Sequence, residues 1–212
     1  TTGNATVGSP SSLTVTINSA TSTAPAATVT NADPGGDGIT YAWMIEAGAN
    51  NIGTFKDLCG AWSWEDESQF QPGEQAVGWT HTSKWLALRL TQPVVVTVTM
   101  ARDATVPWVS PTNPDPNQLG DTTSMNPSFT LWKNWHDTDS DFHTYNNKGA
   151  VGWASELVYL DHVDNSTAES VTRSWYLPAG DYTMALGSNA PSTNANKQGF
   201  SFTIATSQTA PV

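Results

Sequence analysis

The feature that most limits the fold of this chain is a series of short runs in which β-branched and apolar residues alternate with polar ones. These runs occupy residues 13–17, 26–30, 40–45, 85–90, 94–100, 129–132, 171–176, 182–186 and 200–204, and such alternation is typical of half-buried strands. Clusters rich in Gly, Pro and Asp separate several of them, at residues 33–36, 71–73, 111–116 and 178–181, and predict turns. No segment keeps a helical period for more than a turn or two. We therefore expect an all-β fold, a sandwich or jelly-roll-like barrel with long irregular loops.

The length of 212 residues fits a single domain over residues 1–212 and is sufficient to bury a substantial core. No internal repeat divides the sequence further. Residues 1–38 are especially rich in Thr, Ser and Ala, so we expect them to form a flanking strand pair or an arm of the domain.

The composition is acidic and sparsely charged. Charged residues make up 13% of the sequence, and 8 Lys plus Arg against 19 Asp plus Glu give a net charge of −11. This charge repels phosphate backbones and anionic membranes and concentrates cations, so nucleic acid is not expected as a partner. A surface of neutral polar residues is typical of secreted β proteins, so we expect an extracellular or cell-surface location.

The sequence contains a single cysteine. Cys59 is the single cysteine, so no disulfide framework is available and the fold must depend on its core. We expect Cys59 to be a small buried residue beside Trp62 and Trp64, with metal ligation or an intermolecular disulfide as alternatives.

No apolar run approaches the roughly 20 residues of a transmembrane helix, and Thr1 opens a polar segment without signal-peptide character, which favours a processed N-terminus.

Two stretches, residues 50–81 and 134–165, are not expected to form strands, and binding residues are expected to collect there. His81 ends the first stretch, in a Gly-Trp-Thr-His sequence that begins at Gly78. In an extended segment residues two apart project from the same face, so Trp79 and His81 would lie side by side. A neutral imidazole at this place is a ligand for copper or zinc, and the alternative is a packed, hydrogen-bonded histidine.

The second stretch carries Asp137, Asp139 and Asp141 at alternate positions. This spacing opens many calcium loops, because short carboxylates on a tight loop supply oxygens to a hard cation. It is not an EF-hand loop, since Phe142 replaces the required Gly and Lys148 replaces the final Glu. The alternatives are a calcium site completed by other oxygens and a solvated acidic turn.

The remaining histidines flank or follow these aspartates. His136 and His143 lie on either side of them, and an aspartate hydrogen-bonded to one imidazole nitrogen would fix which nitrogen can bind a metal. His162 lies between two aspartates and is expected to have a structural, hydrogen-bonded role.

Four segments resemble the CorA/MopE family of methanotroph surface copper-binding proteins. They are residues 78–88, 143–147, 159–162 and 177–182, within a similarity that runs over most of the chain from about residue 40. The Trp-x-His pair at Trp79 and His81 is the specific feature. The resemblance implies a mononuclear copper(I) site built from two histidines and kynurenine, an oxidised tryptophan, in a protein of copper acquisition associated with the outer membrane surface.

Carried over to this sequence, the resemblance implies that Trp79 is the modified residue and His81 the first histidine ligand. His143 fits best as the second ligand, because it opens the His-Thr-Tyr-Asn-Asn stretch of the shared pattern, and His136 is the runner-up. Chemistry gives the reason for modification, since an intact indole is a donor only and offers copper no σ lone pair. Opening the ring creates an aromatic amine that can ligate. The partner that would receive the copper stays unidentified.

Two other function classes compete with copper capture. Ten Trp residues on an acidic sandwich would stack on sugar rings, with calcium as a structural staple, in a carbohydrate-binding or adhesion module. An enzyme is not expected, because copper oxygenases of polysaccharides need an N-terminal histidine where this sequence has Thr1, and no Gly-x-Ser-x-Gly elbow is present. Copper capture without catalysis is the leading hypothesis, with copper as the ligand and calcium as a second metal.

Overall fold

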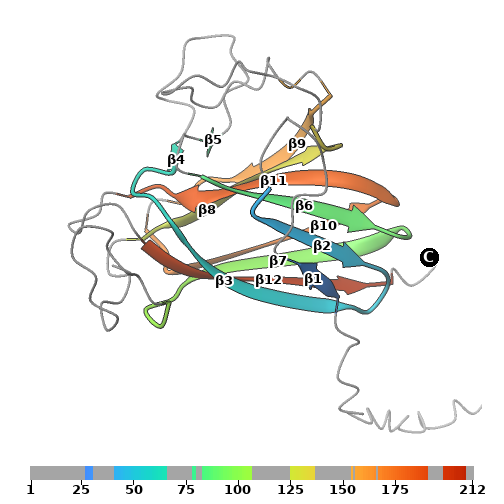
Figure 1. The fold of residues 1–212 in the computed structure, drawn as a ribbon, viewed down its shortest axis with the longest axis horizontal. Helices are drawn as coiled ribbons and strands as arrows, with labels where there is room; N and C mark the ends of the chain where they lie inside the picture. Colours follow the sequence, from blue (N-terminus) through green and yellow to red (C-terminus); the bar gives the residue numbers. More distant parts are fainter. Residues whose placement is uncertain are drawn as a thin grey trace, which may run out of the picture.

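A computed structural model describes residues 27–30, 41–65, 78–79, 83–106, 125–136, 154, 156–165, 167–190 and 198–208. Within these ranges the chain forms strands and no helix, and two large sheets pack face to face (Figure 1). The predicted all-β sandwich is therefore confirmed. The described part of the chain contains no helix long and apolar enough to cross a membrane.

The two large sheets and a small ribbon contain all twelve described strands. The first sheet has six strands, in the spatial order β1 (Thr28–Thr30), β2 (Trp43–Ala47), β6 (Lys84–Leu90), β11 (Gly180–Ser188), β8 (Pro127–Lys133) and β9 (Val158–Val163). The second has four, in the order β10 (Ser170–Leu177), β7 (Val94–Arg102), β12 (Gln198–Ser207) and β3 (Ile52–Cys59). β4 (Trp64–Glu65) and β5 (Gly78–Trp79) form a separate two-stranded ribbon.

The chain passes repeatedly from one large sheet to the other. β2 is followed by β3, β6 by β7, β7 by β8, β9 by β10 and β11 by β12, and each of these steps changes sheet. Strand neighbours pair antiparallel except β2 and β6, which are parallel. Crossing of this kind places consecutive apolar runs on opposite sides of one core.

The main core lies between the sheets and follows directly from the alternation in the sequence. In β7, the side chains of Val94, Val96, Val98 and Met100 are fully buried, whereas the intervening residues are only partly covered. Leu86 and Leu88 of β6 meet them from the first sheet within the same cluster. Removal of these apolar surfaces from water is the main force that holds the two sheets together.

The sequence predicted most strands and missed four. Eight of the nine predicted runs overlap β1, β2, β6, β7, β8, β10, β11 and β12, and the run at residues 13–17 lies outside the described residues. The expectation that residues 50–81 and 134–165 form no strands is wrong, because β3, β4, β5 and β9 lie there. A β-bulge opposite Leu131 and Trp132 breaks the alternation of β9.

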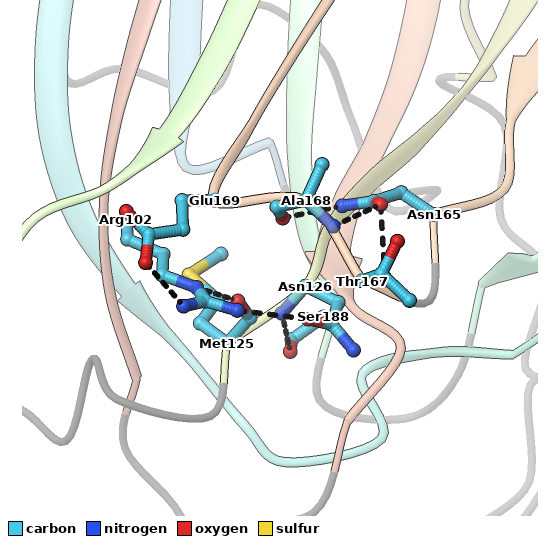
Figure 2. Close-up of polar contacts among 8 residues, drawn as sticks. All are labelled: Arg102, Met125, Asn126, Asn165, Thr167, Ala168, Glu169 and Ser188. Carbon is cyan, nitrogen blue, oxygen red and sulfur yellow. Dashed lines mark hydrogen bonds and ion pairs between the residues drawn. The ribbon is translucent and has the colours of Figure 1, made fainter.

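Arg102 ties the sheets together at one end of the sandwich (Figure 2). From the end of β7, its guanidinium donates to Asn126 Oδ1 at 3.0 Å, to Glu169 Oε1 at 3.2 Å and to the carbonyl of Met125. The backbone N–H of Asn126 donates in turn to Ser188 Oγ at the end of β11. One cation therefore links the second sheet to the entry of β8 in the first.

Candidate functional site

The outer face of the six-stranded sheet, formed by side chains that point away from the second sheet, is buried. A two-sheet sandwich normally leaves such a face in water, yet Thr130, Thr183, Ala185, Ala87 and Trp132 are fully inaccessible there. The ribbon of β4 and β5 contacts β8 and β11, and Figure 1 shows it on the side away from the second sheet. Ala154 and Leu157 complete a second, smaller core on this face.

Trp64 fixes the ribbon to the outer face. Its indole is fully buried, and Nε1 donates to Thr130 Oγ1 at 2.9 Å. The ring stacks on the imidazole of His162, with 5.8 Å between centroids and 30° between planes. Because Trp64 pairs with Trp79 in the ribbon, these contacts fix the backbone at Trp79 over β8.

His162 has the structural role that its sequence position predicted. Its Nδ1 is hydrogen-bonded to the Tyr159 hydroxyl at 2.7 Å, and its backbone N–H donates to Asp161 Oδ1 at 2.9 Å. The hydrogen-bonded role is therefore confirmed, and the stack on Trp64 adds a packing role.

Asp161 connects the site to the second sheet. Its Oδ2 accepts hydrogen bonds from Trp175 Nε1 at 2.8 Å and from Arg173 Nε at 2.9 Å, both on β10. Burial acts to raise the pKa of this carboxyl, but the donors from Trp175, Arg173 and the His162 backbone outweigh it and lower the pKa below 3.8. The carboxylate form is thus the stabilised one.

Residues 134–136, directly after β8, form a hook that returns the chain over the same outer face. Asn134 has a left-handed φ of 73°, and its carbonyl accepts a hydrogen bond from Thr183 Oγ1 at 2.8 Å. The backbone N–H of His136 then donates to the Tyr41 hydroxyl at 3.1 Å, and that hydroxyl lies 2.7 Å from Thr183 Oγ1. These contacts place His136 above β11 instead of beyond the end of β8.

His136 is paired with a carboxylate that sequence analysis did not identify. The His136 side chain is only 2% exposed, and its Nδ1 lies 2.7 Å from Oε2 of Glu156. An ionised carboxylate can only accept, so this contact would be donated by Nδ1–H, and in a neutral ring that tautomer has its lone pair on Nε2. Glu156 lies twenty residues further along the chain, and no spacing rule links the two positions.

Three tryptophan side chains, those of Trp85, Trp132 and Trp135, pack in the second core on this outer face. Trp85 and Trp132 lie with ring centroids 5.7 Å apart, and Nε1 of the buried Trp132 finds no hydrogen-bond partner among the described residues. Trp135 donates from Nε1 to the Tyr182 carbonyl at 2.9 Å, and the guanidinium of Arg89 lies 4.4 Å from its ring centre. The described residues thus give the face an aromatic, poorly hydrated character.

The other predicted site residues are placed as follows. The backbone of Trp79 lies in β5, whereas His81, His143, Asp137, Asp139 and Asp141 lie outside the described residues. Within the described ranges, no three His, Cys, Asp or Glu side chains gather closely enough to hold a metal ion.

Cys59 belongs to the main core and not to this site. It is fully buried, and its Sγ donates to the Gln198 carbonyl at 3.7 Å. The expectation of a small buried residue is confirmed. Of its two tryptophan neighbours in sequence, Trp64 is buried and Trp62 is 46% exposed.

Comparisons with known proteins give no sequence match and several remote structural ones. No protein-family model matches the chain, and no curated protein matches its sequence. One similar solved structure is CorA of Methylomicrobium album BG8, described as a surface-associated copper-binding protein important in copper acquisition. It is 13% identical, with a TM-score of 0.46 over 76% of this chain and 98% of that one.

Two further solved structures are less similar. MopE, a secreted protein of Methylococcus capsulatus in which an oxidized tryptophan facilitates copper binding, is 14% identical, with a TM-score of 0.41 over 74% of this chain and 84% of that one. The pre-peptidase C-terminal domain of a Bacillus anthracis collagenase is 7% identical, with a TM-score of 0.35 over 76% of this chain and 93% of that one. These values are too low to assign a family or a function.

Proposed function

We propose that this protein binds one copper(I) ion at the outer face of the six-stranded sheet and captures copper at the cell surface. The observation that carries the proposal is the Gly78-Trp79-Thr80-His81 segment, whose first two residues form β5 on that face. The segment holds the Trp-x-His pair on which the resemblance to the CorA/MopE family depends. The proposal places the protein outside the cell, associated with the outer membrane, and assigns it no catalytic activity.

The proposed ligands are His81, Trp79 after oxidation to kynurenine, and a second histidine. The sequence pattern favours His143 as the second histidine, with His136 as the alternative. Imidazole and aromatic amine nitrogens are borderline ligands that suit copper, and a surrounding apolar shell limits access of water. The tryptophans of the outer face supply such a shell, and the net charge of −11 concentrates cations near the protein.

Metal analysis of the protein from its native source tests this function. We expect close to one equivalent of copper, held as copper(I). His81→Ala should lose stoichiometric binding, because a site with so few protein ligands cannot lose a strong one. Tyr176→Ala is the control, since Tyr176 is 59% exposed on β10 of the second sheet and is not a proposed ligand. Native protein without copper, or a His81→Ala variant with unchanged copper affinity, would contradict the proposal.

A carbohydrate-binding or adhesion module stapled by calcium is the second candidate. Two aromatic side chains are well exposed among the described residues, Trp62 at 46% and Tyr176 at 59%, and exposed rings can stack on sugars. Metal-free protein should then bind glycans tightly, and Trp62→Ala should weaken that binding. Retention of a single copper ion together with no glycan binding would favour the first function.

A further inference from the structure

The pair of His136 and Glu156 is an unusual feature of the covered outer face. An imidazole that is 2% exposed lies 2.7 Å from a carboxylate that is 41% exposed. The backbone at Glu156 is held as well, because Asn134 Nδ2 donates to its carbonyl at 2.8 Å. The backbone of Glu156 is therefore held by the same hook that carries His136.

The carboxylate decides which imidazole nitrogen can coordinate a metal. With Glu156 ionised, its contact with Nδ1 requires an N–H at that nitrogen, so the lone pair of the neutral ring is on Nε2. A histidine that binds a metal almost always donates its other ring N–H to a carboxylate, carbonyl or water, which fixes the tautomer and the ring orientation. The His136 and Glu156 pair has this geometry.

The His136 and Glu156 pair also lies near β5, the strand that contains the proposed ligand Trp79. The hook places His136 at the level of Thr183, whose Cα partner on β8 is Trp132. Trp64, the ladder partner of Trp79, is bonded to Thr130 of β8. Two residues along a strand correspond to about 7 Å, so the hook and the ribbon occupy adjacent positions over one sheet face.

We propose that Glu156 positions His136 as a nitrogen ligand of the metal, by holding the imidazole proton on Nδ1 and directing the Nε2 lone pair to the metal. This inference rests on the proposed copper function and makes His136 the second histidine. Glu156 is a positioning residue, because it acts through His136 and does not itself contact the metal.

The test combines copper(I) affinity, from competition with a chromophoric chelator, with the tautomer of His136 from ¹⁵N NMR of the metal-free protein. Glu156→Ala should lower the affinity about 10- to 100-fold and shift His136 away from the Nδ1–H form. Glu156→Gln should keep most of both, because its amide oxygen can still accept from Nδ1–H. Glu169→Ala is the matched control, since that carboxylate is 81% exposed and contacts Arg102, which lies at the end of β7 in the second sheet.

The outcomes separate this inference from the function on which it rests. Wild-type protein that binds no copper overturns both. Wild-type protein that binds copper, with unchanged affinity in Glu156→Ala and His136→Ala, overturns the inference alone and leaves His143 as the second ligand. Reduced affinity in Glu156→Ala with an unchanged His136 tautomer also overturns it, because a purely structural role for Glu156 would produce that result.

Discussion

Gly78 and Trp64 lie so close across the β4 and β5 ribbon that no side chain other than hydrogen fits at position 78. A Cβ built on Gly78 would lie 1.9 Å from Nε1 of Trp64, and the φ of Gly78 is +89°. The indole of Trp64 in turn is fixed by Thr130 and by the stack on His162. The path of the chain into Trp79 therefore depends on a glycine at position 78.

Gly78→Ala should displace β5 and weaken the proposed copper site. The matched control is Gly180→Ala, because Gly180 has a φ of +147° but a Cβ there would meet nothing within 4 Å. Backbone strain should cost about 1–3 kcal/mol in both variants, and the clash with Trp64 should add about 1–3 kcal/mol to Gly78→Ala alone. Denaturant unfolding and copper titration measure the two effects, and equal losses of stability would show that the indole moves aside.

Arg102 and Glu169 should contribute very differently to stability although they form one ion pair. The Arg102 side chain is 18% exposed and the Glu169 side chain 81%, so the pair is screened by water and Glu169→Gln should change the unfolding free energy by less than about 0.5 kcal/mol. Arg102→Met removes the donors to the Met125 carbonyl and to Asn126 Oδ1, at a cost of about 2–3 kcal/mol. Similar losses in both variants would indicate that the ion pair itself dominates.

Asp161 should contribute to acid unfolding. Its pKa in the folded protein is below the ordinary value of 3.8, so the carboxylate stabilises the fold above that value and the contribution disappears as the pH falls through the folded pKa. Trp175→Phe removes a donor to Oδ2 and should raise the pKa of Asp161. The acid midpoint, followed by circular dichroism between about pH 5 and 2, should then move to higher pH, and an unchanged midpoint would rule out this contribution.

The sequence predicts strands well where one face is in water and one in the core. In β7 the alternate residues Val94, Val96, Val98 and Met100 are buried, and the residues between them are partly exposed, so the alternation predicts the strand. In β9 a bulge leaves Leu160 without a partner and 40% exposed. The alternation is lost there, and the strand was predicted as loop.

The covered outer face could not be predicted for a related reason. Thr130 and Thr183 are at alternate positions that a two-layer sandwich exposes, and threonine is compatible with a solvated face. Both are fully buried because the ribbon and the hook cover them. The pairing of His136 with Glu156 likewise depends on Asn134 turning the chain back, which residue spacing does not show.

Calcium chelation tests the site predicted at Asp137, Asp139 and Asp141. A ligand that binds only the folded state at a hundred times its Kd stabilises it by about 2.7 kcal/mol, which corresponds to about 5–10 °C for a chain of this size. Chelation should lower the thermal midpoint by that amount, and a variant with all three aspartates replaced by Asn should not respond. A wild-type midpoint that ignores both chelator and added calcium would leave these residues as a solvated acidic turn.

Oxidation of Trp79 is the most specific prediction for this chain. An indole beside a bound copper ion is placed for oxidative ring opening, in which dioxygen is the oxidant and the C2–C3 bond is cleaved. Hydrolysis then releases the C2 carbon as formate, and the aromatic amine that remains would supply a ligand that the indole lacks. A peptide of residues 77–84 from the native protein should carry a small mass increase at Trp79, with kynurenine-like near-ultraviolet absorption. Protein made without copper in a foreign host should keep an intact Trp79 and bind copper more weakly, because only the two imidazoles remain. Unmodified Trp79 in native, fully copper-loaded protein would reduce the site to two histidines.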